Sequence, residues 1–319
     1  MEQMMHTDTA VLNDYLKAYT DYMPNSEACQ VNIANSIWFR DRDSLAINED
    51  FLKTSRNYYD ACIFEAPFDG GTRDDINSWV KKETNGMIQK LLEEAPPRDA
   101  VMYLVNALSF DGEWRDIYKK NQIHKGTFNA ENGEHQPAEF MYSTEAVYLE
   151  NTWGRGFLKP YGDGAYAFAA VLPDEGMTMK EFLERLKENG ITDLLEQTRN
   201  KTVCVRLPKF TVEYNVVLNE SLMESGMKDA FDSQKADFSS MAHSDNDNIY
   251  ISKVIHKTKI DVDEKGTKAG AVTAVEVSEG SAVQTEEPKE VFLDRPFFYM
   301  IIDTRQNVPL FMGCLMQLE

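Results

Sequence analysis

The feature that most constrains this chain is a long segment of small residues near its C-terminal end. Residues 261–290 read DVDEKGTKAGAVTAVEVSEGSAVQTEEPKE, and no proline occurs from Val262 to Glu287. Proline removes a ladder hydrogen bond, so a stretch without it is compatible with the interior of a sheet. The composition is that of a strand, yet few bulky side chains are present to anchor the segment.

Strand alternation divides residues 267–277 into two different faces. One face carries Thr267, Ala269, Ala271, Thr273, Val275 and Val277, and the other carries Lys268, Gly270, Val272, Ala274 and Glu276. The segment suits a mobile exposed loop, an inserted central strand, or a permanent strand with a polar tail at 278–290. Full insertion would form roughly ten backbone hydrogen bonds at about 1 kcal/mol each, which rivals the stability of a whole domain. A loop that can insert but is held out would therefore store free energy.

Composition and motifs exclude several functional classes. The net charge of −20 argues against nucleic acid or an anionic membrane as partner and is interpreted as a solubility feature. No window approaches the roughly 18 apolar residues of a membrane helix. The four cysteines are not closely spaced and the five histidines lack metal-ligand spacing, so neither a metal nor another cofactor is expected. Without a GxSxG elbow or a phosphate-binding loop, no catalytic residue is assigned and no enzyme is expected.

Periodicity along the rest of the chain predicts a mixed α+β fold. Helices are expected at 9–23, 73–92, 178–187 and 190–197, with Thr72 capping the second of them. Strands are expected at 28–39, at 101–110 with both faces covered, at 166–176, at 203–214 with a break at Pro208, and at 248–263. The ENGE sequence at 131–134 predicts a hairpin, and the C-terminus predicts two buried strands joined by a turn at 305–307.

Several motifs, in order and at consistent spacing, resemble those of the serpin family. The sequence VIHKTKIDVDEKGTKAGAVTAVEV resembles the strand and hinge that lead into the reactive-centre loop, and LVNALSFDGEW resembles the central-strand motif. LPKFTVEY, FAAVLPDEG, INSWVKKETNGMI and the C-terminal RPFFYMIIDTRQNVPLFMG resemble further family motifs. The resemblance implies one domain over 1–319, with a large central mixed β-sheet, two further sheets, surrounding helices and a hinge and loop at 264–290.

The family's first helices have no counterpart in this sequence. The chain is therefore expected to be N-terminally incomplete, and a signal peptide is not found in MEQMMHTDTA. The resemblance favours an extracellular protein, although the compartment is not readable from the residues themselves. A true absence of these helices is expected to expose the back of the central sheet.

The resemblance also implies roles for individual residues. Glu264 and Lys209 correspond to an ion pair at the upper end of the sheet, the breach, where Trp114 also lies. Asn106 and His256 correspond to a hydrogen-bonded pair beneath the opening sheet, the shutter. An ordinary ion pair and ordinary core packing are the simpler interpretations of the same residues.

The hinge in this resemblance consists of Gly266, Thr267, Ala269, Gly270 and Ala271. In the family, bulky or charged hinge residues accompany loss of inhibition, and every inward-facing hinge residue here is small. The resemblance therefore favours an inhibitor that acts as a suicide substrate: a serine protease forms an acyl-enzyme with the loop, and loop insertion then traps it. The alternatives are a non-inhibitory serpin acting as a binding or carrier protein, and a fragment unable to fold.

The attacked bond is placed by counting the family's seventeen positions from Glu264. The count gives Gly280 followed by Ser281, with Ala282 and Val283 as shifted alternatives. No lysine or arginine occurs between Lys268 and Lys289, which argues against a trypsin-like target. No aromatic residue is present there either, so the small residues favour an elastase-like or subtilisin-like serine protease. The protein is expected to act as a monomer.

Overall fold

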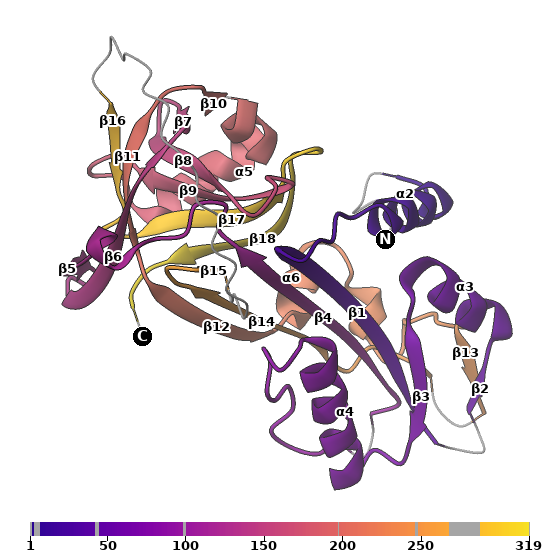
Figure 1. Cartoon of the computed structure of the whole chain (residues 1–319). Helices are drawn as coiled ribbons and strands as arrows, with labels where there is room; N and C mark the ends of the chain where they lie inside the picture. Colours follow the sequence, from indigo (N-terminus) through magenta and orange to yellow (C-terminus); the bar gives the residue numbers. More distant parts are fainter. Residues whose placement is uncertain are drawn as a thin grey trace. The chain divides into compact units, whose positions relative to one another are not determined.

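The computed structural model describes residue 2 and residues 7–41, 45–97, 100–196, 198–245, 248–267 and 288–318 (Figure 1). The chain divides into two compact units, each built from three separate segments. Unit 1 comprises Met1–Pro24, Val31–Ser109 and Glu213–Lys259, and unit 2 comprises Asn25–Gln30, Phe110–Val212 and Ile260–Glu319. Because these segments alternate along the sequence, neither unit corresponds to one continuous stretch of chain.

One sheet contains the predicted hinge residues Gly266 and Thr267. Its six strands have the order β12 (Phe210–Val217), β14 (Val254–Val262), β15 (Gly266–Thr267), β4 (Met102–Glu113), β1 (Cys29–Arg40) and β3 (Cys62–Ala66). The sheet is mixed, since β1 pairs with β3 in parallel whereas β15 is antiparallel to both β14 and β4.

The remaining strands form three further sheets. A second six-stranded sheet has the order β10 (Thr198–Arg199), β7 (Val147–Glu150), β8 (Gly154–Pro160), β9 (Tyr166–Pro173), β17 (Phe297–Asp303) and β18 (Val308–Leu315). A four-stranded sheet has the order β16 (Lys289–Phe292), β11 (Val203–Pro208), β6 (His135–Glu145) and β5 (Ile123–Asn129). β13 (Ala242–Ser244) pairs with β2 (Leu45–Ile47).

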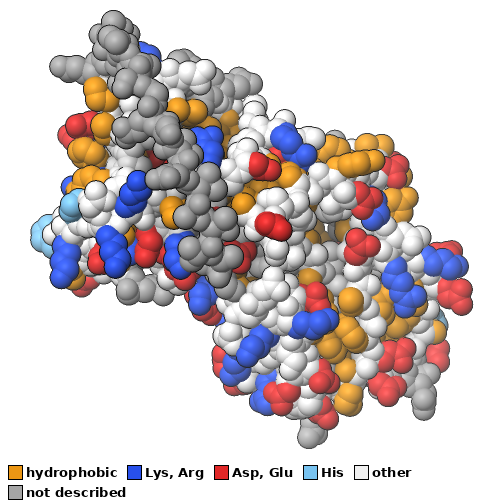
Figure 2. Space-filling view, in the orientation of Figure 1, with side chains coloured by type: hydrophobic (Ala, Val, Ile, Leu, Met, Phe, Trp, Pro, Cys, Tyr) orange, Lys and Arg blue, Asp and Glu red, His pale blue; other side chains and the backbone are white. Residues whose placement is uncertain are grey.

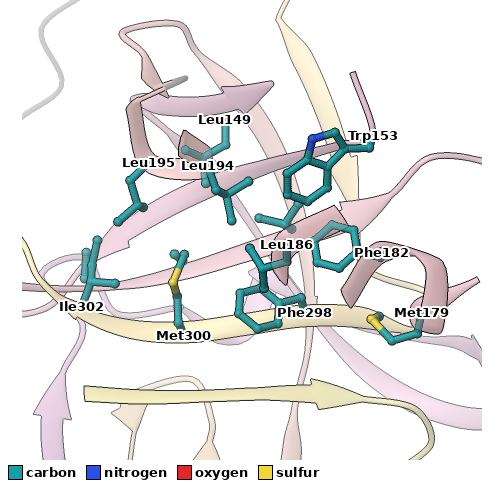
Figure 3. Close-up of a cluster of buried hydrophobic side chains, with 13 residues drawn as sticks. Leu149, Trp153, Met179, Phe182, Leu186, Leu194, Leu195, Phe298, Met300 and Ile302 are labelled. Carbon is teal, nitrogen blue, oxygen red and sulfur yellow. The ribbon is translucent and has the colours of Figure 1, made fainter. Parts of the chain in front are cut away.

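The helices are α2 (Thr9–Asp21), α3 (Glu49–Tyr59), α4 (Gly70–Glu83), α5 (Met179–Glu196) and α6 (Asn219–Glu224), with short 3-10 turns at Lys120–Gln122 and Asp229–Phe231. Together with the sheets they confirm the predicted α+β class. In unit 2, α5 packs on the second sheet, and Phe182 from this helix contacts Trp153 and Phe298 at ring-centre distances of 4.8 and 5.8 Å (Figure 3). Every residue of β9 is buried, which gives unit 2 a rigid framework.

The predicted helix at 73–92 is wrong at both ends. α4 starts after Asp69, whose carboxylate accepts a hydrogen bond from the backbone N–H of Thr72, while the Thr72 hydroxyl accepts one from the N–H of Asp69. Thr72 is thus the third helical residue of a capping box rather than the cap itself. The helix ends at Glu83, because Asn85 (φ 49°) and Gly86 (φ 74°) are in the left-handed region.

Two predicted strands also differ from the structure. β14 begins at Val254 rather than at 248, and at its start the Asn219 side chain donates to the Ser252 carbonyl and accepts from the Val254 N–H. β4 is not covered on both faces. Tyr103, Val105 and Ala107 are buried, but Leu104 is 38% exposed and Asn106 is exposed.

Other local predictions are confirmed. α5 contains the expected break, at Gly190, where φ is 82°. The expected strand at 203–214 separates at Pro208 into β11 and β12, which belong to different sheets. Gly133 (φ 85°) forms the turn of the β5–β6 hairpin, and Asn307 (φ 55°) lies in the β17–β18 turn.

Candidate functional site

The first two predicted hinge residues form a strand. Gly266 pairs with Glu113 and Thr267 with Gly112 of β4, while Thr267 also pairs with Val262 of β14. β14 and β4 themselves pair directly at Val254–Leu104 and Ile255–Val105. Among the described residues, the nine-residue β14 and the twelve-residue β4 therefore share only these two direct pairs. The two-residue β15 lies between them in the strand order.

A close contact between two glycines fixes the position of β15. A Cβ atom on Gly266 would overlap the carbonyl oxygen of Gly112. A Cβ atom on Gly112 would in turn lie 2.5 Å from the Phe110 ring. Gly266 therefore needs glycine because its backbone lies close to that of Gly112, and Gly112 needs glycine because the Phe110 and Tyr161 rings pack against it.

The first inward-facing hinge side chain is already buried. Thr267 is 1% exposed, as expected for the face to which strand alternation assigns it. Its hydroxyl lies 2.5 Å from the hydroxyl of Tyr161, which is itself fully buried. Burial raises the pKa of the Tyr161 phenol, so this side chain is neutral at pH 7. The Thr267 hydroxyl thus faces a neutral hydroxyl in the interior. A charged side chain at this position would be buried without an opposite charge to compensate it.

The turn at residues 114–118, here called the hinge clamp, holds the backbone that leads into the hinge. The Trp114 N–H donates to the Lys265 carbonyl at 2.8 Å, and the Tyr118 N–H donates to the Glu264 carbonyl at 2.9 Å. The Trp114 indole N–H donates to the Asp263 carbonyl at 2.8 Å. The indole also stacks on Tyr161 at 4.4 Å. Three hydrogen bonds therefore attach residues 263–265 to Trp114 and Tyr118, the two buried end residues of this turn.

The structure brings Glu264 and Lys209 together. The Lys209 ammonium lies 2.8 Å from the Glu264 carboxylate and 3.2 Å from the Glu139 carboxylate of β6. The hydrogen bond from Lys209 is the main cause that lowers the pKa of Glu264. Burial alone would lower the pKa of Lys209, but the hydrogen bonds that its ammonium donates to the two carboxylates raise it. Both groups of the pair are therefore charged at neutral pH.

The other expected pair is not joined in the same way. The side-chain amide of Asn106 donates to Asn35 at 2.8 Å, and no hydrogen bond to His256 is found within the described part of the chain. The direct β14–β4 pairing ends at Ile255–Val105, the residues that precede His256 and Asn106. Partial burial lowers the pKa of His256, which keeps the imidazole neutral.

Sequence reasoning missed four residues of this site, namely Asp263, Tyr118, Tyr161 and Glu139. Only Asp263 has a local signal, since its carboxylate accepts from the N–H groups of Lys265 and Gly266 in the manner of an Asx turn. The other three reach the hinge from distant segments, so no local pattern indicates them.

Several expected site residues lie outside the described residues. These are the hinge residues Ala269, Gly270 and Ala271 and the candidate bond residues Gly280, Ser281, Ala282 and Val283. Within the described ranges, no group of His, Cys, Asp and Glu has the arrangement of a metal site, and none of the helices is long and apolar enough to span a bilayer. Figure 2 shows basic and acidic side chains interspersed over the visible face of the molecule.

Comparison with known sequences identifies one family. The family model described as Serpin (serine protease inhibitor) matches residues 1–318. An uncharacterized serpin-like protein of Methanosarcina acetivorans is 32% identical over 291 residues, covering 89% of this chain and 67% of that protein. A serpin-like protein of Thermococcus kodakarensis is also 32% identical, covering 88% of this chain and 65% of that protein. The chain thus spans about two thirds of the length of these relatives.

Solved structures agree with the sequences. The native state of the thermophilic serpin tengpin has a TM-score of 0.92 at 43% identity, covering 99% of this chain and 81% of that one. Its latent state has a TM-score of 0.84, covering 97% of this chain and 82% of that one. These matches confirm the predicted serpin fold, with its large mixed sheet and further sheets, and the chain belongs to the serpin family.

Proposed function

We propose that this serpin inhibits serine proteases by acting as a suicide substrate. The serine oxygen of the protease would add to the carbonyl carbon of Gly280, and the Ser281 nitrogen would leave with a proton from the protease's general acid. In the alternative assignments, the protease would attack at Ala282 or Val283 instead. The freed segment would then insert between β14 and β4, and the resulting pull on the acyl-enzyme would distort the oxyanion hole and stall deacylation.

The observation that carries this proposal is the two-residue strand β15. It lies between β14 and β4 in the strand order, both of which are much longer, and it would supply the first two residues of an inserted strand. The sequence that follows Thr267 has small residues on the face that would turn inward. Each further residue of such a strand would gain backbone hydrogen bonds worth about 1 kcal/mol net. Insertion of the whole segment would thus release free energy on the order of 10 kcal/mol.

The preferred targets in this proposal are elastase-like or subtilisin-like proteases. Their shallow specificity pockets accept small side chains such as those of GSAV at 280–283. A trypsin-like protease would need a basic residue, which its pocket carboxylate binds. No such residue is present between Lys268 and Lys289.

The direct test is incubation of the protein with elastase, subtilisin and trypsin, followed by denaturing gel electrophoresis. We expect a band at the summed mass of inhibitor and protease with elastase or subtilisin and none with trypsin. Mass spectrometry of the released C-terminal fragment would locate the attacked bond. Cleaved loop together with free, active protease in every lane would refute inhibition and support the alternative of a binding or carrier protein.

The matched variants for this test are Thr267→Arg and Thr267→Ser. Arginine would have to bring a charge into the interior that now holds the Thr267 hydroxyl, so we expect cleavage without a stable complex. Serine keeps the hydroxyl that faces Tyr161, so complex formation should persist. Unchanged inhibition by Thr267→Arg would show that inhibition does not require a small, uncharged side chain facing inward at this position.

A further inference from the structure

A buried ion pair lies beside the hinge clamp in unit 2. The Lys159 ammonium of β8 lies 2.8 Å from the Glu145 carboxylate of β6, and the two side chains are only 2% and 6% exposed. Glu145 also accepts a hydrogen bond at 2.7 Å from the hydroxyl of Ser143. A pair this deeply buried stands apart from the mostly exposed ion pairs elsewhere in the described chain, and no step of the proposed inhibition uses it.

The ammonium of Lys159 also contacts the underside of the clamp. It lies 4.4 Å from the centre of the Tyr118 ring and 5.4 Å from that of Trp114, both within the range of cation–π attraction. It donates a hydrogen bond at 3.3 Å to the carbonyl of Asp116, the residue midway through the clamp. Lys159 therefore touches the first, middle and last residues of the turn.

The charged state of Lys159 is secured by its neighbours. Burial would lower the pKa of the ammonium, but Tyr118 and Glu145 outweigh burial and raise the pKa above its ordinary value. The Tyr118 hydroxyl lies 3.2 Å from the Ser143 hydroxyl, so the carboxylate, the serine, the tyrosine and the lysine form a closed network. Such a network is rigid when every member has a partner.

We propose that Lys159 and Glu145 are positioning residues for the hinge clamp, and that they set the rate at which a strand enters the sheet after Thr267. The pair holds Trp114 and Tyr118 where their N–H groups bind the carbonyls of Lys265 and Glu264. Without the pair, the clamp would loosen and residues 263–265 would move more easily. The effect on insertion rests on the proposed function, whereas the effect on the clamp does not.

The main variant is the double substitution Lys159→Met with Glu145→Gln. It removes both charges and keeps side chains of similar length, because a single substitution would leave the other charge buried and unpaired. Ser143→Ala is a milder second variant that removes one hydrogen bond from Glu145. Phe182→Leu is the matched control, since it perturbs the unit 2 core, whose members do not include the clamp.

The first measurement is hydrogen exchange of the intact protein. In the double variant we expect the amides of Trp114 and Tyr118 to exchange at least about tenfold faster, while those of β9 remain as in the wild type. Ser143→Ala should shift the same amides in the same direction by less. Wild-type exchange at Trp114 and Tyr118 in both variants would overturn the positioning role.

The second measurement is uptake of a synthetic peptide with the sequence of residues 267–277, followed on native gels without any protease. The double variant should take up this peptide at least about tenfold faster than the wild type, and Phe182→Leu should not. Equal rates in the double variant and the control would overturn the effect on insertion. If the wild type takes up no peptide at all, the proposed function fails, while hydrogen exchange still decides the positioning role.

Discussion

The entry to the hinge and the surroundings of Asn106 are stabilised in different ways. At the hinge entry, Trp114, Thr267 and Tyr161 are buried, and three hydrogen bonds attach the clamp to residues 263–265. Around Asn106, alternate side chains of β4 are exposed. The Asn106 side-chain amide donates a hydrogen bond to the side-chain amide oxygen of Asn35. The C-terminal end of β4 thus leads into a buried network of hydrogen bonds and aromatic rings. Around Asn106, one face of β4 is buried and the other is exposed.

The difference indicates where substitutions should act. A substitution in the buried network removes packing contacts and hydrogen-bond partners together, so it should lower the free energy of unfolding strongly. Side chains on the exposed face of β4 are in contact with water, so their substitution should change the free energy of unfolding little. Comparing matched substitutions in the two regions tests this contrast directly.

The largest effect is expected from Trp114→Ala. The substitution removes a stacked ring and the hydrogen bond to Asp263, and should lower the free energy of unfolding by about 3–5 kcal/mol. Leu104→Ala, on the exposed face of β4, should cost about 1 kcal/mol or less. Urea unfolding at pH 7 measures both, and similar losses would remove the contrast between the two regions.

A smaller effect is expected from Gly266→Ala. The added methyl group would overlap the Gly112 carbonyl, so β15 must shift or detach, at a cost of about 1–3 kcal/mol. Gly70→Ala is the control, because a Cβ atom there meets nothing within 4 Å. Thermal unfolding should show a lower midpoint for Gly266→Ala alone. Equal midpoints would mean that the close glycine contact is not needed.

Glu264→Gln should weaken the protein by less than about 1 kcal/mol, because the pair with Lys209 is partly exposed. The pKa of Glu264 is lowered from 4.5, so the unfolded state binds the proton more tightly. The contribution of this carboxylate is therefore complete above pH 4.5 and is lost as the pH falls through the folded-state pKa. The difference in thermal midpoint between wild type and variant should accordingly vanish in acid, and a difference that persists there would contradict the pairing.

The smallest effect is expected from the partly buried His256. Its pKa is lowered from 6.5, so the unfolded state binds a proton more readily, and stability should fall as the pH decreases below 6.5. His256→Gln removes this titration. Stability curves from pH 8 to pH 5 should therefore be flatter for the variant than for the wild type, whereas parallel curves would show that His256 is not a buried neutral group.

Sequence alone predicted much of the architecture because local signals dominate there. The Pro208 break, the Gly190 kink and the Asn-Gly hairpin each follow from the backbone preferences of one or two residues. The helix at 73–92 was predicted too long because its apolar stripe continues past Glu83. Ile88, Leu91 and Leu92 are buried in the same core as Ile76 although the helix has ended.

The site was predictable only where a motif contains both partners. The family resemblance matched Glu264 with Lys209, and the structure places these two groups within hydrogen-bonding distance. Lys159 and Glu145 have no such signal, because each would normally be assigned to the surface. Their burial depends on two strands, β6 and β8, and on the turn at 114–118, which meet only after folding.

The glycine contact beneath β15 has a consequence for how a strand would lengthen from Thr267. A growing strand normally has to search among alternative alignments, and a shift by one residue exchanges its two faces. Here neither Lys265 nor Thr267 fits in the position of Gly266 opposite Glu113, because a Cβ atom there would overlap the Gly112 carbonyl, so one alignment would be selected before growth starts. The alignment of Gly266 would therefore determine which face of the sheet each later residue occupies. Insertion would then proceed by extension of a strand that is already started.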